Sequence, residues 1–308
     1  MFGAQTEFGK LKRVLMHRPG RELDCVSAET AAAYNFRRPV HKARFQGEFD
    51  TLTESISEAG AEVVLLTDVL RSEPDALAYI RRRPNMCYTR DLAVVLSKGV
   101  VLMSMAIKGR KGDTWVIGRA MQRLGVPLLG AIEPPGFLEG GGVQFMDERT
   151  VVVSLCDRAT EVAIKQFCDL VLGACVDRVV MVMVPEGHIH IDGSLMFINR
   201  RLAIGHLASL DLHPSVIFEN GKQPRYTFFS TFLQENDVEM IETTLEERRA
   251  MAINYVCTAP LEAVGWTWAT RLSDEIRKRG GKVWSVDGTE LVNGNGGPHC
   301  LTCPIERE

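Results

Sequence analysis

The chain has 308 residues, of which 45% are hydrophobic and 24% are charged, proportions that are typical of a globular protein. The formal net charge of −3 and the absence of a long basic run exclude the electrostatic footprint of a nucleic-acid-binding protein. The sequence also lacks a secretory leader, an apolar run long enough to cross a membrane and regularly spaced cysteines, so we expect a cytoplasmic protein with no membrane contact.

One unit recurs along the chain, in which a short strand, a tight turn and a second strand precede a helix and a further strand. The unit is clearest over residues 91–124 and again over residues 143–184. In chain order, we predict strand 12–17, helix 43–59, strand 62–66, strands 91–96 and 100–105, helix 114–124, strands 143–145 and 150–155, helix 160–172, strand 179–184, strands 194–198 and 202–205, strand 252–256, helix 268–279 and strand 282–286.

The alternation of strands and helices predicts an α/β fold. About five such units favour a closed, pseudo-symmetric ring, because an open doubly wound sheet would not restart its hairpin each time. No linker divides the sequence, so we expect residues 1–308 to form a single domain. No Gly-x-Gly-x-x-Gly segment follows the first strand, and the sequence therefore gives no support for a dinucleotide cofactor.

Two of the units place an acid and an arginine at the same spacing. Arg110 follows Asp91 by nineteen residues, and Arg158 follows Glu139 by the same number. Ordinary surface ion pairs would explain a spacing of this kind. The unusual segments around the two acids favour a role in a site instead.

The most unusual of these segments is the glycine-rich stretch 293–304, which contains Cys300. We expect the glycines at 294, 296 and 297 to allow positive φ angles and a close approach of the backbone to a ligand. We expect Cys300 itself to lie in a short apolar strand. A cysteine in this setting, with histidines and acids elsewhere in the chain, is a candidate nucleophile.

Two further segments carry polar residues in a pattern that suggests a site. His188, His190 and Asp192 alternate along a predicted strand, so we expect their side chains to point to one face. Such a polar face is too costly to bury without a function. Glu139 precedes three glycines, whose lack of side chains would leave room for a substrate near its carboxylate.

Convergence of Asp91, Glu139 and Asp192 would create a site with surplus negative charge. Guanidinium suits such a site because its planar donors match carboxylates in bidentate fashion. The same acids would raise the pKa of the Cys300 thiol, and a bound guanidinium would favour the thiolate. His190 would then protonate the departing amine and later deprotonate water.

These segments resemble the guanidino-modifying enzymes of the pentein superfamily, and arginine deiminases in particular. The most specific match is Gly296-Gly-Pro-His-Cys-Leu-Thr-Cys-Pro-Ile305, and the likeness extends from Val14-Leu-Met-His-Arg-Pro19 to this tail. The resemblance implies a five-bladed α/β propeller that hydrolyses the guanidinium of free arginine, or of a close analogue, through a covalent thiouronium intermediate. It implies no cofactor and no metal.

By position, the resemblance also assigns roles to individual residues. Cys300 corresponds to the nucleophile and His190 to the general acid and base. Asp91 and Asp192 correspond to the guanidinium clamps, and Glu139 to the support of the histidine and the substrate. The residues that correspond to the binding of the α-carboxylate and its surroundings are Asn85, Arg110 and Arg158.

The chain departs from the family pattern at three places. Gly142 stands where arginine deiminases usually have aspartate, and Asn293 and Asn295 stand in a run that often contains arginine. The helical insertion of long arginine deiminases is absent, because only 47 positions lie between Asp91 and Glu139. These departures affect the choice of substrate and acceptor more than the covalent step.

Several alternatives remain open at this point. An amidinotransferase of the same fold would pass the amidino group to an amine, and related hydrolases act on methylated arginine or hydrolyse arginine twice to ornithine. In a different class, His188-x-His190 and Cys300-x-x-Cys303 would form a Cys₂His₂ zinc site. The expected partner is a small guanidino substrate, and a homo-oligomer is compatible with the sequence.

Overall fold

The computed structural model describes residues 1–308. Its strands are β1 (Leu11–Met16), β2 (Glu62–Leu65), β3 (Ala93–Leu96), β4 (Gly99–Leu102), β5 (Leu128–Ala131), β6 (Val143–Asp147), β7 (Thr150–Leu155), β8 (Arg178–Met183), β9 (Leu195–Asn199), β10 (Leu202–Gly205), β11 (Ser215–Glu219), β12 (Arg225–Thr227), β13 (Glu239–Glu242), β14 (Val256–Ala259), β15 (Glu262–Trp266), β16 (Lys282–Val286) and β17 (Cys303–Arg307). The α-helices are α1 (Lys42–Glu58), α2 (Leu66–Val69), α3 (Pro74–Ile80), α4 (Asp113–Arg123), α5 (Glu161–Val171), α6 (Leu207–Leu210), α7 (Phe229–Glu235), α8 (Leu245–Arg249) and α9 (Thr270–Lys278). Short 3₁₀ helices are η1 (Arg21–Cys25), η2 (Ala31–Tyr34), η3 (Pro84–Cys87), η4 (Thr89–Leu92), η5 (Lys108–Arg110), η6 (Gly140–Gly142), η7 (Ile191–Gly193) and η8 (Leu291–Gly294).

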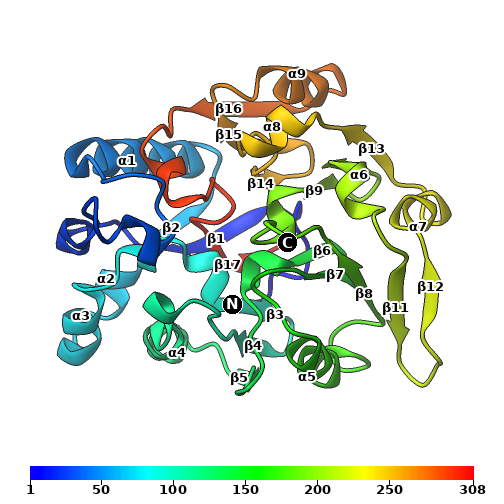
Figure 1. The fold of residues 1–308 in the computed structure, drawn as a ribbon, viewed down its shortest axis with the longest axis horizontal. Helices are drawn as coiled ribbons and strands as arrows, with labels where there is room; N and C mark the ends of the chain where they lie inside the picture. The colour runs from blue at the N-terminus through cyan, green and yellow to red at the C-terminus, as the bar shows by residue number, and fades with distance from the viewer.

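The strands form five separate mixed sheets. Figure 1 shows the sheets arranged around the middle of the molecule, with α1, α4, α5 and α9 at the periphery. The fold is therefore α/β, as the alternation of strands and helices predicts.

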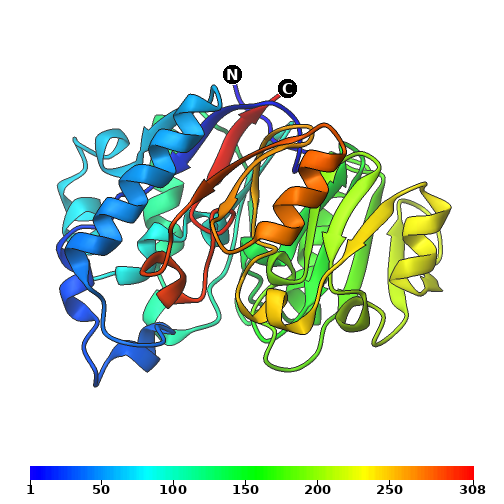
Figure 2. The same cartoon turned by 90° about the horizontal axis from the view of Figure 1, so that it is seen from above.

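Each sheet contains the same three-strand arrangement. In the sheet of β3, β4 and β5, the first two strands are antiparallel, and the third returns through α4 to lie parallel to β4. The sets β6–β7–β8, β9–β10–β13 and β14–β15–β16 repeat this pattern. In the fifth sheet, β17 from the C-terminal end is the antiparallel partner of β1, and β2 lies parallel to β1. Figure 2 accordingly shows the two chain ends side by side at one edge of the molecule.

The sequence explains why the main elements form where they do. Helix α1 presents Phe45, Phe49, Leu52 and Ile56 at spacings of three and four residues, and all four side chains are buried. Helix α5 begins after Thr160, whose hydroxyl accepts a hydrogen bond from the backbone N–H of Ala163. The valine-rich strand β7 has a partner on both sides and is buried along most of its length.

Three local predictions were wrong. The predicted strand 252–256 begins only at Val256. Residues 188–190 form no regular element, and η7 follows them, so the alternating polar residues do not share a strand face. Cys300 lies in a turn before β17 and not in a strand. Each of these segments precedes the first strand of a sheet, where the chain turns inward before pairing begins.

The positive φ angles expected from the glycine run also fall elsewhere. Asn295 has a φ of 60°, whereas none of the glycines at 294, 296 and 297 has a positive φ. Those glycines serve close packing instead, because a Cβ on Gly297 would lie 2.5 Å from the side-chain oxygen of Asn254.

Two further findings concern the chain as a whole. No helix combines the length and the apolar character that crossing a membrane requires. All eight cysteines are free thiols.

Candidate active site

Acidic residues of three sheets occupy the same place in the repeated unit, the short segment before its first strand. Asp91 lies in η4 before β3, Glu139 directly precedes η6 and β6, and Asp192 lies in η7 before β9. The other two sheets supply Asn254 shortly before β14 and Cys300 shortly before β17. All five residues are buried, and the repeat thus directs one polar residue from each sheet toward the middle of the molecule.

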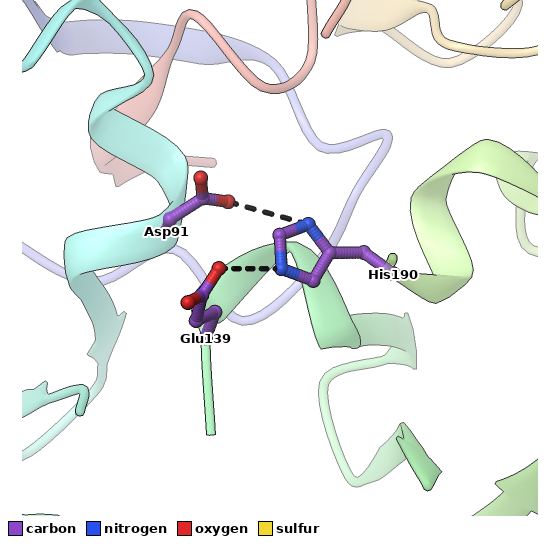
Figure 3. A group of neighbouring side chains, drawn as sticks. All are labelled: Asp91, Glu139 and His190. Carbon is purple, nitrogen blue, oxygen red and sulfur yellow. Dashed lines mark hydrogen bonds and ion pairs between the residues drawn. The ribbon is translucent and has the colours of Figure 1, made fainter. Parts of the chain in front are cut away.

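His190 lies between two of these acids (Figure 3). Its Nε2 is 2.9 Å from Oε2 of Glu139, and its Nδ1 is 3.6 Å from Oδ1 of Asp91. Gly141 makes this approach possible, because a Cβ there would lie 2.5 Å from Nδ1 of His190 and 2.9 Å from the Asp91 carboxylate. The glycines after Glu139 therefore make room for the protein's own histidine.

Charge, and not burial, sets the ionisation of this pair. Burial alone would raise the pKa of the Glu139 carboxyl, but the hydrogen bond from His190 and the charges of His190, Arg110 and Arg158 lower the pKa to about 2. For His190 burial has the opposite sign and would lower the pKa, but Asp91 and Glu139 raise the pKa of His190 above its ordinary value. The two acids therefore stabilise the protonated form of His190.

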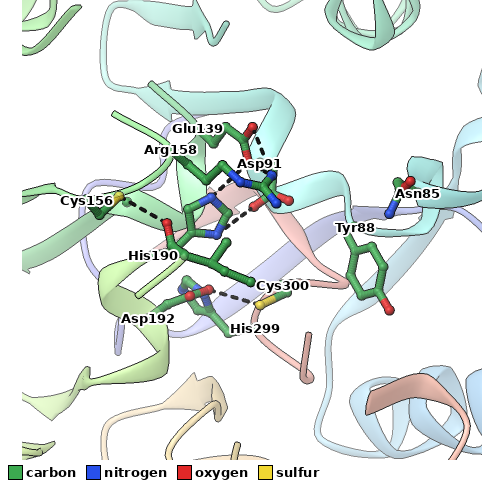
Figure 4. Close-up of polar contacts among 12 residues, drawn as sticks. Asn85, Tyr88, Asp91, Glu139, Cys156, Arg158, His190, Asp192, His299 and Cys300 are labelled. Carbon is green, nitrogen blue, oxygen red and sulfur yellow. Dashed lines mark hydrogen bonds and ion pairs between the residues drawn. The ribbon is translucent and has the colours of Figure 1, made fainter. Parts of the chain in front are cut away.

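The thiol of Cys300 lies against Asp192, at the other side of the site (Figure 4). Its Sγ is 3.1 Å from Oδ2 of Asp192, which is also 2.9 Å from Nδ1 of His299. The second ring nitrogen of His299 is 3.1 Å from Oε2 of Glu7, near the N-terminal end. A buried line of contacts therefore runs from Glu7 through His299 and Asp192 to the thiol.

Asn254 fixes the turn that carries Cys300. Its side-chain N–H groups donate to the backbone oxygen of Asp192 at 3.0 Å and to Sγ of Cys300 at 3.3 Å. Its side-chain oxygen accepts from the backbone N–H of His299 at 3.0 Å and of Cys300 at 3.3 Å. Sequence reasoning missed Asn254, His299 and Glu7. Asn254 gave no usable signal, because it falls inside the predicted strand 252–256.

The resting thiol of Cys300 is neutral at physiological pH. Burial raises its pKa well above the ordinary value, and the negative charges of Asp192 and Asp91 raise it further. This direction is the one that the surplus of acids predicts.

The raised pKa has a measurable consequence in the free protein. Alkylation by iodoacetamide requires the thiolate, so its rate at Cys300 should keep rising as the pH increases above 9. Asp192→Asn removes one negative neighbour, lowers the pKa and should accelerate alkylation at pH 8. The pH profile of alkylation, followed by mass spectrometry of the Cys300 peptide, checks both expectations. A rate that is already constant below pH 8 would contradict them.

The three residues predicted to bind the substrate's carboxylate are engaged within the protein. Arg110 forms an ion pair with Asp91, and Nη1 of Arg158 is 3.3 Å from Oε2 of Glu139. Asn85 donates to the backbone oxygen of Tyr34 at 2.8 Å and accepts a 3.3 Å hydrogen bond from Arg110 through its own backbone oxygen. The nineteen-residue spacing thus corresponds to two buried ion pairs, and the carboxylate-binding role stays a prediction.

The residues of the alternative zinc site do not converge. Nε2 of His188 is 3.2 Å from the hydroxyl of Ser209, and the Cys303 thiol faces the backbone oxygen of Ala93 at 3.7 Å. The group whose donor atoms do lie within 4.8 Å of one another is Asp91, Glu139 and His190. Both of its carboxylates already have arginine partners, which a cation would have to displace.

A cavity of about 200 Å³ adjoins the site and has His190 and Asp192 in its lining. Larger hollows of about 600 and 790 Å³ lie around Trp115, and no predicted site residue lines them. The smaller cavity is therefore the one that connects to the buried cluster.

Comparison with known proteins places this arrangement in a family. The arginine deiminase family profile matches residues 72–307. An arginine deiminase of Listeria welshimeri is 26% identical over 258 residues, which make up 73% of this chain and 62% of that protein. An arginine deiminase of Listeria monocytogenes is 22% identical over 402 aligned positions, which cover 98% of this chain and 97% of the relative. The longer alignment shows that this relative has segments that the present chain lacks.

Solved structures agree on the fold. One similar structure is a cysteine-to-serine variant of dimethylarginine dimethylaminohydrolase from Pseudomonas aeruginosa, complexed with citrulline. It superposes with a TM-score of 0.72 at 15% identity, over 96% of this chain and 100% of that chain. The N-terminal domain of ArgZ, covalently bound to a reaction intermediate, gives a TM-score of 0.74 at 16% identity, over 96% and 98% of the two chains. Because the family profile spans most of the sequence, the chain belongs to the arginine deiminase family.

Proposed function

We propose that the protein hydrolyses the guanidinium group of free arginine or a close arginine analogue, with Cys300 as the nucleophile. One observation carries the proposal. The buried thiol of Cys300, which contacts Asp192, lies in the same site as the cluster of His190, Glu139 and Asp91 (Figure 4). The family assignment and the ArgZ structure with its covalently bound intermediate add support.

Substrate binding would create the nucleophile. Burial and the charges of Asp192 and Asp91 raise the pKa of the Cys300 thiol, and a guanidinium held between the two acids compensates these charges. The thiol then gives up its proton to solvent in the adjoining cavity, and the thiolate attacks the guanidinium carbon. The resulting tetrahedral adduct has a new C–S bond.

His190 would act in both halves of the reaction. Its raised pKa makes it a proton donor to the amine that leaves as the adduct becomes a thiouronium. Neutral His190 then removes a proton from water, which attacks the same carbon. Cleavage of the C–S bond releases citrulline and restores Cys300, so that arginine and water give citrulline and ammonia. Glu139 orients the imidazole through its 2.9 Å contact with Nε2.

We assign Asn85, Arg110 and Arg158 to the carboxylate-bearing end of the substrate. In the resting protein, Arg110 and Arg158 neutralise Asp91 and Glu139. An incoming guanidinium competes for those carboxylates, and each arginine that it releases is free to bind an anion. Binding is then an exchange of ion pairs inside one site.

The products of the reaction test the proposal directly. We expect arginine to give citrulline and ammonia in equal amounts, without ornithine, and the citrulline formed in ¹⁸O-labelled water to carry one label. Chromatography with mass spectrometry measures all three compounds. Ornithine with two ammonia would indicate a dihydrolase, and dimethylamine from dimethylarginine would indicate a methylarginine hydrolase. Transfer of the amidino group to glycine or lysine would contradict hydrolysis.

We further propose that the five sheets are the blades of a pseudo-symmetric propeller and that residues 1–308 act as one domain. Their common strand arrangement and the similar placement of one polar residue per sheet support this view. All eight cysteine thiols are free, which favours a location of the protein in the reducing cytoplasm.

A further inference from the structure

The cavity beside His190 and Asp192 has a cationic wall that no part of the proposed mechanism uses. Arg37 comes from the segment after η2, and Arg248 and Arg249 come from the last turn of α8. We call these three residues the arginine wall. The wall belongs to the same cavity of about 200 Å³ as the catalytic histidine.

None of the three arginines forms an ion pair. Arg37 donates from Nε to the side-chain oxygen of Asn295 at 2.6 Å, a neutral partner. Nε of Arg248 is buried and has no hydrogen-bond partner. The nearby acid Glu247 is taken by Arg271. The arginine wall therefore presents positive charge without an ion-pair partner to the cavity, where it favours the binding of an anion.

The lining of the cavity thus carries both signs of charge. Asp192 lies beside the thiol and suits a guanidinium, whereas the arginine wall suits an anion. The tail of free arginine carries one carboxylate and one ammonium, so it has no net charge. A zwitterionic tail matches the wall poorly, because three cations attract the carboxylate and repel the ammonium.

We propose that Arg37, Arg248 and Arg249 act together with Asn85, Arg110 and Arg158 on the tail of the substrate and select a guanidino acid whose tail carries net negative charge. This inference rests on the proposed function and narrows its substrate class to arginine analogues that keep the carboxylate and lack a free ammonium. The arginine wall acts on binding and takes no part in bond making or breaking.

Three compounds of similar shape test the proposal. Arginine has both tail charges, 5-guanidinopentanoate keeps only the carboxylate, and agmatine keeps only the ammonium. For the unchanged protein, we expect kcat/KM to be about tenfold higher with 5-guanidinopentanoate than with arginine, the ratio that about 1.4 kcal/mol of differential binding gives. Agmatine should be the poorest of the three.

Arg248→Gln provides the sharper measurement. It should raise KM for 5-guanidinopentanoate about tenfold and lower KM for agmatine, because removal of a cation weakens anion binding and relieves repulsion of the ammonium. The side chains of Arg37 and Arg249 are exposed, so their replacement by glutamine should have a smaller effect. Each variant should raise KM for 5-guanidinopentanoate about threefold and lower KM for agmatine about threefold. The kcat values should stay within about twofold, and Arg81→Gln, at an exposed arginine without an ion pair, serves as the matched control.

Two results would overturn the inference while leaving the proposed function intact. One is a higher kcat/KM for arginine than for 5-guanidinopentanoate. The other is a change of KM in the same direction for all three compounds in the Arg248 variant, which a merely structural role would produce. If the unchanged protein consumed none of the three compounds, the proposed function itself would fail.

Discussion

Replacement of Cys300 by serine should lower turnover of the guanidino substrate by roughly 10⁴-fold or more, as removal of a nucleophile does in other covalent enzymes. A serine hydroxyl at this site keeps the contact with Asp192 but is a far weaker nucleophile than a thiolate at neutral pH. Steady-state assays of citrulline formation measure the loss. The acids and His190 keep their positions, so substrate binding should persist and is measurable by calorimetry.

Cys303→Ser is the matched control for this variant. Cys303 is also buried, but its thiol faces the backbone oxygen of Ala93 and touches no site residue. The control variant should retain most of the activity. Equal damage from both substitutions would mean that the two cysteines work as a redox or metal pair, and the assignment of Cys300 as the nucleophile would be wrong.

His190→Ala should lower kcat by at least about a hundredfold, the usual contribution of a general acid and base. Without the imidazole, both the departure of the amine and the activation of water become slow. If the second step suffers more, a covalent adduct on Cys300 should accumulate, and intact-protein mass spectrometry detects it.

His188→Ala separates this role from a general effect of losing a histidine. His188 lies two residues away, but its ring contacts the Ser209 hydroxyl and not the acids of the site. Its removal should therefore change kcat much less. A near-normal rate in the His190→Ala variant would exclude His190 as the general acid and base.

The sequence predicts those parts of the fold that depend on local periodicity. Strand 150–155 matches β7, because its run of β-branched residues bounded by turns marks a buried strand clearly, and strand 282–286 matches the partly exposed β16. The segment 188–192 also alternates, yet it forms no strand. Its polar residues turn toward other sheets, and such long-range contacts override a local pattern.

The same distinction applies to the candidate site. Glycine runs and clustered polar residues drew attention to Glu139, His190 and Cys300 without any structure. His299 lies in the same glycine-rich stretch as Cys300, but its contact with Glu7 joins positions 292 residues apart and gives no signal in the sequence. The spacing of Arg110 and Arg158 from their acids is compatible with surface ion pairs, whereas the burial of these pairs depends on packing that a sequence does not display.

The pairing of β17 with β1 brings residues from the two ends of the chain into one sheet. The backbone N–H of Gly3 donates to Ile305 at 2.8 Å, and that of Arg307 donates to Gly3 at 2.8 Å. Contacts between positions this distant in sequence close late in folding, because the loop entropy must be overcome first. The turn with Cys300 leads directly into β17, so the acids can be in place before the nucleophile is. A circular permutant that joins the two ends and opens the exposed turn at 220–224 would make this pairing local, and the thiol would then be positioned early.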